Sequence, residues 1–397
     1  MAVPDDRPLR LAVVESAPRG GLLIYASQLA DALGARGHAV DLITARGSEL
    51  QGLEHGRLRE ILAAAVKDPS EPPAGWRYQR RRAGIALRLS AASLRTAIEL
   101  RRGRYDAAIL ADDLNVALAV VWALLLTAGP GRPRMAAVCH EPKPRNRFAG
   151  QDVYLESGRL HTLLGRLYSR LDVVFVHGRR SLRQFEETWP PSRVRIIPFG
   201  ADRMEGDETV APPSDEARIL FFGDWRRPKG LPELMQAFDR VAARVPEARL
   251  TIAGTPSPDS DPAAVRAWAA GHDGRVELHD GYVPTGAVAG LFARARVVVV
   301  PYVAASQSSV AALGMKAARA VVATDVGDLP DSVLDGVTGR IVPPGDIEAL
   351  AAALEEVLTD PDLAARFGAA GRERVLTGLG WDRVAAAVEG HLRDLDR

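Results

Sequence analysis

The sequence predicts an α/β protein made of two Rossmann-like, doubly wound domains that face each other across a cleft. The chain has 397 residues, more than one ordinary hydrophobic core organises, so two domains of roughly 200 residues are expected. Short apolar runs alternate with segments of helical periodicity, which is typical of parallel sheets covered by helices. Between two such series, residues 201–216 are polar, lack periodicity and contain Pro212 and Pro213, as expected of a linker.

The first half begins with an apolar run at residues 9–14, which predicts a strand. Leu22 and Leu29 then recur at helical spacing, and Gly37 is placed to end that helix. Short apolar runs and segments of helical spacing likewise predict the other strands and helices of this half. Strands are expected at 40–44, 107–110, 135–140, 173–177 and 194–198, and helices at about 84–102, 115–127, 153–170 and 181–188.

The second half repeats the alternation with longer apolar runs. Ile219–Phe222 and Val297–Val300 are uninterrupted, as strands buried on both faces of a parallel sheet usually are. Strands are expected at 218–222, 249–253, 276–279, 297–300, 321–324 and 339–342, and helices at 231–244, 262–270, 286–293, 308–318, 346–358 and 361–376.

The end of the chain forms a separate element. Trp381, Val384 and Leu392 recur on one helical face, so an amphipathic terminal helix is expected to pack back across the domain junction. The predicted organisation is an N-terminal Rossmann-like domain at 1–205, a linker at 206–216, a C-terminal Rossmann-like domain at 217–378 and this helix at 379–397.

Composition places the chain among ordinary globular proteins of the cytoplasm. It is 47% hydrophobic and 25% charged. The longest apolar stretch, Val116–Leu126, is shorter than the roughly 20 residues that a membrane-spanning helix needs. A single cysteine, Cys139, excludes an internal disulfide and fits a reducing compartment. The start, Met1–Pro8, does not read as a secretory signal.

Charge is distributed unevenly along the chain. Residues 1–200 hold 30 Lys and Arg against 20 Asp and Glu, whereas the remainder is acidic. The basic excess concentrates in Trp76–Arg104, which has nine arginines and one glutamate. The region Arg77–Arg104 either contacts an anionic membrane at its inner face or a phosphorylated acceptor, or is a solvated helix face. Nucleic acid is disfavoured, because no recognition motif accompanies the charge.

A cationic loop follows the strand at 218–222. Gly223 ends the strand, Arg226, Arg227 and Lys229 follow, and a helix starts after Gly230. Ligands of open α/β sheets bind beyond the carboxyl ends of the strands, where helix N-termini offer N–H groups to anions. Lys229 is one of only four lysines among 51 basic residues, which favours a point charge placed for a phosphate. A solvated loop is the alternative.

A second possible anion site follows the strand at 297–300. Gln307, Ser308, Ser309 and Val310 lead into a helix, and Ser308 or Ser309 can either bind a phosphate oxygen or simply cap the helix. Together with Lys229, this helix start favours a diphosphate ligand.

The first half offers two weaker candidates. Gly20 and Gly21 lie in the turn after the first strand, where they permit close backbone approach of a ligand or only make a turn. His140 follows the strand at 135–140 and is succeeded by Glu141 and Lys143. His140 is either functional or a satisfied structural histidine. The Walker, zinc-protease and nucleophile-elbow motifs are absent from the sequence.

These segments resemble family 4 retaining glycosyltransferases. The resemblance rests on Phe221–Gly223, Lys229-Gly230, Ala253-Gly254, Pro301–Val310 and Ala320–Pro330, and more thinly on Arg19–Gly21, His140 and Val194–Gly200. It implies the GT-B architecture of two Rossmann domains, with acceptor binding in the N-terminal domain at 1–205 and sugar-nucleotide binding in the C-terminal domain at 217–378. It also implies a catalytic set of His140, Lys229 and Arg226, a donor site including Gly20, Gly21, Gly223, Arg227, Gly254 and Gln307 to Val310, and acceptor contacts from Glu141 and Lys143.

The chain departs from the common family pattern at three positions. Asp224 stands where an arginine is usual, so Arg226 or Arg227 would supply the second charge. The two usual glutamates are replaced by Ala305 and Leu313. A subgroup with Gln-Ser-Gly-Val in this region is similar to Gln307-Ser308-Ser309-Val310.

The resemblance implies a retaining, metal-independent transfer of a sugar from a nucleoside diphosphate to a hydroxyl acceptor, with no cofactor beyond the donor. The acceptor is a small-molecule natural product or a lipid-linked glycan. Three alternatives stay open: a sugar-nucleotide epimerase, a glycoside phosphorylase, and a catalytically inactive sugar-nucleotide-binding subunit.

Overall fold

The computed structural model divides into two compact units. Unit 1 comprises Met1–Pro198 with Trp381–Arg397, and unit 2 comprises Phe199–Gly380. The predicted helix 115–127, most of Trp76–Arg104 and most of the linker 206–216 lie outside the described residues. The structure describes residues 7–62, 91, 94, 96–111, 132–143, 145–146, 153–154, 159–189, 191–201, 215–257 and 259–395.

Unit 1 is built on a seven-stranded sheet in the order β3-β2-β1-β4-β5-β8-β9, and every pairing in it is parallel. The chain winds outward from β1 in both directions, as in doubly wound folds. A separate antiparallel pair, β6 with β7, is short. The strands are β1 (Arg10–Val14), β2 (Ala39–Ala45), β3 (Arg57–Leu62), β4 (Ala107–Leu110), β5 (Arg134–Val138), β6 (Arg145–Asn146), β7 (Val153–Tyr154), β8 (Val173–Val176) and β9 (Val194–Ile196).

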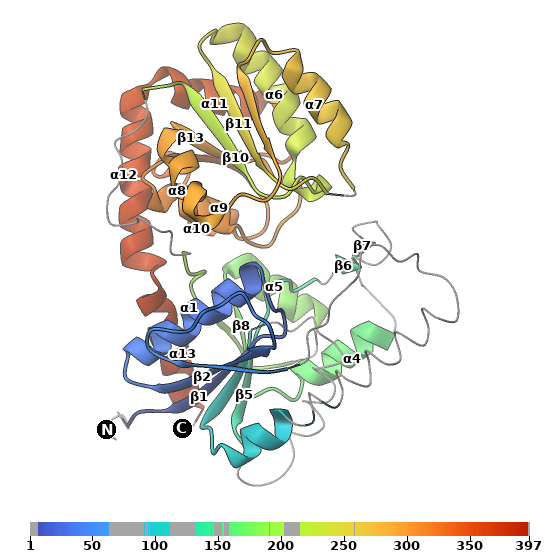
Figure 1. Ribbon diagram of the computed structural model, residues 1–397, viewed down its shortest axis with the longest axis vertical. Coiled ribbons are helices and arrows are strands. Elements are labelled where there is room, and N and C mark those ends of the chain that lie inside the picture. The colour runs from blue at the N-terminus through green and yellow to red at the C-terminus, as the bar shows by residue number, and fades with distance from the viewer. Residues whose placement is uncertain are drawn as a thin grey trace. The chain divides into compact units, whose positions relative to one another are not determined.

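The last helix of the chain belongs to unit 1 and packs on its first helix. Tyr25 of the first helix and Trp381 of the last lie with ring centroids 4.9 Å apart, and Arg36 forms an ion pair with Glu389 at 2.7 Å. Figure 1 shows these two helices side by side. The helices of this unit include α1 (Gly21–Ala35), α4 (Arg159–Tyr168), α5 (Arg179–Thr188) and α13 (Trp381–Asp394).

Unit 2 is built on a six-stranded parallel sheet in the order β12-β11-β10-β13-β14-β15. Its strands are β10 (Arg218–Phe222), β11 (Arg249–Gly254), β12 (Val276–Asp280), β13 (Val297–Val300), β14 (Ala320–Thr324) and β15 (Gly339–Val342). Its helices are α6 (Leu231–Arg244), α7 (Pro262–Ala270), α8 (Thr285–Arg294), α9 (Ser309–Lys316), α10 (Leu329–Ser332), α11 (Ile347–Thr359) and α12 (Pro361–Gly378), with a 3-10 turn η2 (Arg227–Lys229).

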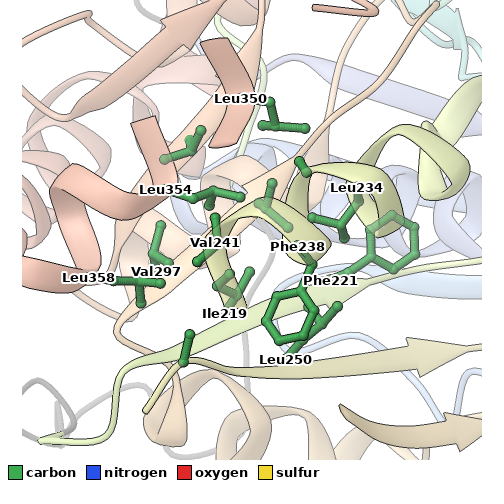
Figure 2. Packing of buried hydrophobic residues seen from close by; sticks show 14 of the residues in the cluster. Ile219, Phe221, Leu234, Phe238, Val241, Leu250, Val297, Leu350, Leu354 and Leu358 are labelled. Atoms are coloured by element: carbon green, nitrogen blue, oxygen red, sulfur yellow. The ribbon is translucent and has the colours of Figure 1, made fainter. Parts of the chain in front are cut away.

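Helices pack on both faces of the unit 2 sheet. Successive side chains of each strand point to opposite faces, so both sets are buried. Ile219 and Phe221 of β10 pack with Phe238 of α6 and Leu354 of α11 on one face (Figure 2). Leu220 instead joins a second cluster with residues of α8 and α9. Burial of each such side chain contributes about 1.5–3 kcal/mol, which fixes the strand ends that carry the site.

Three local predictions were wrong. The segment expected to be helical from residue 153 begins with strand β7, and α4 starts only at Arg159. Strand β3 was missed because its sequence, Arg57–Leu62, carries three charges and lies at the sheet edge. The helix expected at 308–318 is shorter, since Ser308 caps it and it ends at Lys316. Among the described residues, no helix is long and apolar enough to cross a membrane.

Candidate functional site

The loop after β10 has two positions whose backbone conformation favours glycine. Gly223 has φ +130°, and Gly230, which ends the 3-10 turn η2 and caps α6, has φ +71°. A Cβ on Gly230 would lie 1.8 Å from the carbonyl oxygen of Pro301. The loop after β10 therefore lies directly against the loop after β13.

Backbone contacts join three loops at the carboxyl edge of this sheet. The Val303 N–H donates to the carbonyl of Pro228 at 2.9 Å, and the Trp225 N–H donates to the carbonyl of Thr255 at 3.0 Å. A Cβ on Gly254 would lie 1.8 Å from the carbonyl oxygen of Gly223. Gly223 and Gly254, two of the predicted donor glycines, thus allow the chain segments at the ends of β10 and β11 to pack closely.

The three cations of the loop after β10 have different partners. Arg226 Nε lies 2.7 Å from Asp224 Oδ2. Arg227 forms a bidentate ion pair with Glu233, with its two terminal nitrogens 2.5 and 2.9 Å from the carboxylate oxygens. Lys229 Nζ lies 4.0 Å from the centroid of the Tyr302 ring, and no carboxylate of the described residues pairs with it. Its charge is therefore the one of the three that no acid offsets within the described part of the chain.

The start of α9 lies in the loop that holds Tyr302. Ser308 is the N-cap: its Oγ accepts from the Ala311 N–H at 3.3 Å and donates to the Tyr302 hydroxyl at 3.3 Å. Ser309 and Val310 follow in the first turn, where N–H groups have no partner inside the helix. Backbone groups of α9, rather than the Ser308 hydroxyl, are thus placed to meet an anion.

Gln307 is engaged with the loop after β14. Its Nε2 donates to Asp328 Oδ2 at 2.7 Å, and the Asp328 N–H donates to the carbonyl of Ser306 at 2.9 Å. Gly327 has φ +52°, and a Cβ there would lie 2.3 Å from the carbonyl oxygen of Ala305. Asp328 is 1% exposed. Its buried hydrogen bond with Gln307 joins the loops that follow β13 and β14.

In unit 1, His140 lies two residues beyond β5 and its two ring nitrogens are engaged. Nε2 lies 3.0 Å from the carbonyl oxygen of Ala111, and Nδ1 lies 3.3 Å from His177 Nε2. A carbonyl only accepts, so His140 Nε2 carries its proton and Nδ1 accepts from His177. Tyr25 lies edge-on to the His140 ring with centroids 4.8 Å apart.

Burial keeps this histidine pair neutral. It lowers the pKa of His140 to about 4. It also lowers the pKa of His177 well below its ordinary value, and the neighbouring His140 lowers it further. Near neutral pH, His140 is therefore a hydrogen-bond donor to a backbone carbonyl and not a cation.

The other unit 1 candidates lie at the carboxyl ends of β1 and β5. Gly20 has φ +97° and caps α1, and its N–H donates to Glu49 Oε1 at 2.8 Å. Among the described residues other than its chain neighbours, no atom lies within 4 Å of a Cβ built on Gly20 or Gly21. Glu141 and Lys143 are half-buried and flank Pro142.

Both halves of the chain match glycosyltransferase families. Residues 19–204 match the family described as Glycosyltransferase Family 4, and residues 216–360 match Glycosyl transferases group 1. The fold is similar to that of sucrose-phosphate synthase from Thermosynechococcus elongatus, with a TM-score of 0.75 at 21% identity over 98% of this chain and 99% of that chain. The chain is a GT-B glycosyltransferase.

This glycosyltransferase also resembles two further proteins. It is 34% identical over 178 residues to the alpha-maltose-1-phosphate synthase of Mycolicibacterium smegmatis, a match that covers 42% of this chain and 45% of that synthase. This chain thus spans under half of that relative's length in the match. The structure of Anabaena Alr3699/HepE in complex with UDP and glucose has a TM-score of 0.70 at 14% identity, over 97% and 99% of the two chains.

The glycosyltransferase gathers its predicted donor residues of unit 2 at one sheet edge. Gly254 is the last residue of β11, and the others follow β10 or β13: Gly223, Arg226, Arg227, Lys229 and Gln307 to Val310. Sequence reasoning missed Tyr302 and Asp328. The signal for Tyr302 was an aromatic residue directly after the Val297–Val300 run. Within the described ranges, no three His, Cys, Asp or Glu side chains gather as metal ligands; metal independence stays a prediction.

Proposed function

We propose that this glycosyltransferase moves a sugar from a nucleoside diphosphate to a hydroxyl acceptor with retention of anomeric configuration, and without a metal ion or other cofactor. The observation that carries the proposal is Lys229, whose charge no acid offsets in the described structure. It lies at the same sheet edge as the first turn of α9. A point charge and a helix start together suit the two phosphates of a leaving diphosphate.

The chemistry needs charge stabilisation on the leaving group. As the bond between the anomeric carbon and the β-phosphate oxygen breaks, negative charge grows on the diphosphate. Lys229 and the N–H groups of Ser309 and Val310 would stabilise that charge, and one well-placed donor of this kind is worth about 3–4 kcal/mol. The acceptor oxygen bonds the anomeric carbon, and its proton passes to the β-phosphate. No protein carboxylate takes part.

We infer smaller parts for the other candidates. Arg226 and Arg227 already pair with acids, so we infer that they shape the loop more than they bind phosphate. His140 is neutral and both its ring nitrogens are engaged, which favours a role in positioning the sugar over one as general base. Glu141 and Lys143, beside it, remain our candidates for acceptor contacts.

We infer a uridine nucleotide as the first donor to test, because Alr3699/HepE, which shares the fold, was solved with UDP and glucose. The test is isothermal titration of the full chain with UDP, GDP and dTDP, followed by the sugar nucleotide of whichever binds. Proton NMR of the product of a transfer reaction then reports the anomeric configuration. An inverted product would overturn the retaining mechanism.

A peripheral membrane contact is supported by one described surface. Leu94 and Ile98 are 44% and 41% exposed and lie one helical turn apart. Arg102, a further turn along, is exposed as well. Aliphatic and cationic side chains on one helix face suit an anionic lipid surface. The acceptor would then be lipid-linked, whereas a soluble natural product needs no such surface.

Vesicle sedimentation tests the contact. We expect binding to vesicles with phosphatidylglycerol, weaker binding to pure phosphatidylcholine, and loss of binding in the Leu94→Gln, Ile98→Gln double variant. Leu376→Gln, at a residue of α12 that is 56% exposed, is the matched control. Equal sedimentation of the double variant and the wild type would exclude this face.

A further inference from the structure

Tyr302 holds the ammonium of Lys229 while being held itself on two sides. Its ring lies under Lys229 Nζ at 4.0 Å, and its side chain is 1% exposed. Its hydroxyl accepts from Ser308 Oγ at 3.3 Å, and its backbone carbonyl accepts from Thr324 Oγ1 at 2.5 Å. The ring is therefore a fixed surface, set by β14 and by the cap of α9.

A ring partner differs in its effect from the acid partners of Arg226 and Arg227. A carboxylate cancels a cation's net charge, whereas the face of an aromatic ring attracts the cation and leaves its net charge in place. Lysine is a flexible side chain with a strongly hydrated head. A ring contact thus restrains the head without consuming the charge that a phosphate needs.

Tyr302 also lies between the two elements that would meet a diphosphate. One side of it contacts Lys229, and the other contacts Ser308, whose Oγ caps α9 through the Ala311 N–H. The loop that holds Tyr302 also leaves no room for a side chain at Gly230, because Gly230 lies against Pro301. The lysine and the helix start are thus linked through one buried side chain.

We propose that Tyr302 is a positioning residue that holds Lys229 for the diphosphate of the donor. This inference rests on the proposed function, since it assigns a task to the same site. Its distinguishing consequence is that the contribution of the Tyr302 ring to diphosphate binding depends on the presence of Lys229.

A double-mutant cycle on the full chain tests it, with binding of the preferred nucleoside diphosphate measured by titration calorimetry. We expect Tyr302→Leu to weaken binding on the order of 10-fold, and Tyr302→Phe, which keeps the ring, to change it less than about threefold. In a Lys229→Met background, Tyr302→Leu should have no further effect. Circular dichroism and thermal melting establish that each variant folds.

The possible outcomes separate the two proposals. If Tyr302→Leu weakens binding equally with and without Lys229, its role is only structural and the positioning inference is wrong. If Tyr302→Leu binds as the wild type does while Lys229→Met does not, the inference fails and the proposed function stands. If the wild type binds no nucleoside diphosphate, both the proposed function and the inference are wrong.

Discussion

Gly230 and Pro301 approach so closely that a Cβ on the glycine would lie 1.8 Å from the proline's carbonyl oxygen. The two residues follow β10 and β13, which are neighbours in the unit 2 sheet. Their approach lets the Val303 N–H reach the carbonyl of Pro228 at 2.9 Å. This contact places Lys229 and Tyr302 together.

Gly230→Ala should separate these loops. The variant meets both a left-handed φ of +71° and a collision with backbone that cannot rotate away. Gly274→Ala is the matched control, because Gly274 has φ +75° and open space around its Cβ. A left-handed alanine alone costs about 1–2 kcal/mol. We expect Gly230→Ala to lower the melting temperature further than Gly274→Ala and to weaken nucleotide binding; equal effects of the two would contradict the close contact.

Arg226→Ala and Arg227→Ala should affect nucleotide binding much less than loss of Lys229. Each arginine already contacts an acid, Asp224 or Glu233, at 2.5–2.9 Å, and exposed pairs of this kind contribute about 0–1 kcal/mol. We expect affinity changes below about fivefold, measured by calorimetry. A loss from Arg226→Ala as large as that from Lys229→Ala would show that Arg226 leaves Asp224 to bind the donor.

The histidine pair predicts that stability falls as the solution is acidified. The folded pKa of His140 is about 4, below the value of about 6.5 for an unfolded histidine. The unfolded chain therefore takes up protons that the native chain does not. Stability is fully present above about pH 6.5 and is lost as pH falls toward 4, by up to about 1.4 kcal/mol per pH unit for each such histidine.

Urea unfolding at pH 7 and pH 5 measures this effect. We expect His140→Gln to lose less stability than the wild type between these pH values. His279→Gln serves as the control, since the His279 side chain is 42% exposed and pairs with Glu277. If His140→Gln and the wild type respond equally, the pair is not neutral in the folded protein.

The architecture of unit 2 could be predicted from sequence because its strands are buried on both faces. An uninterrupted run such as Val297–Val300 has few alternatives, and the observed β13 has the predicted bounds. Edge elements failed for the opposite reason. In the charged strand Arg57–Leu62, Glu60 lies between Leu58 and Leu62 on the same face, so no clean apolar alternation indicates it. The β7 pairing at Val153–Tyr154 depends on a partner strand.

The site could be predicted as a set of loops but not as a set of contacts. The spacing of Lys229 after β10 indicated an anion site, whereas its partner Tyr302 lies 73 residues further along, on the neighbouring strand's loop. Sequence left Ser308 open between a ligand and a cap, and the structure shows the cap. Arg226 and Arg227 both pair with acids, whereas Lys229 lies over the Tyr302 ring. These partners depend on side-chain directions, which sequence periodicity does not predict.

In the proposed function, Lys229 supplies the charge that binds the donor's diphosphate. The most direct test is calorimetric titration of the wild type and of Lys229→Ala with UDP, GDP and dTDP. We expect one nucleotide to bind the wild type and Lys229→Ala to weaken its binding about 10²–10³-fold, the range for loss of one well-placed donor. Equal binding of that nucleotide by both proteins would contradict it.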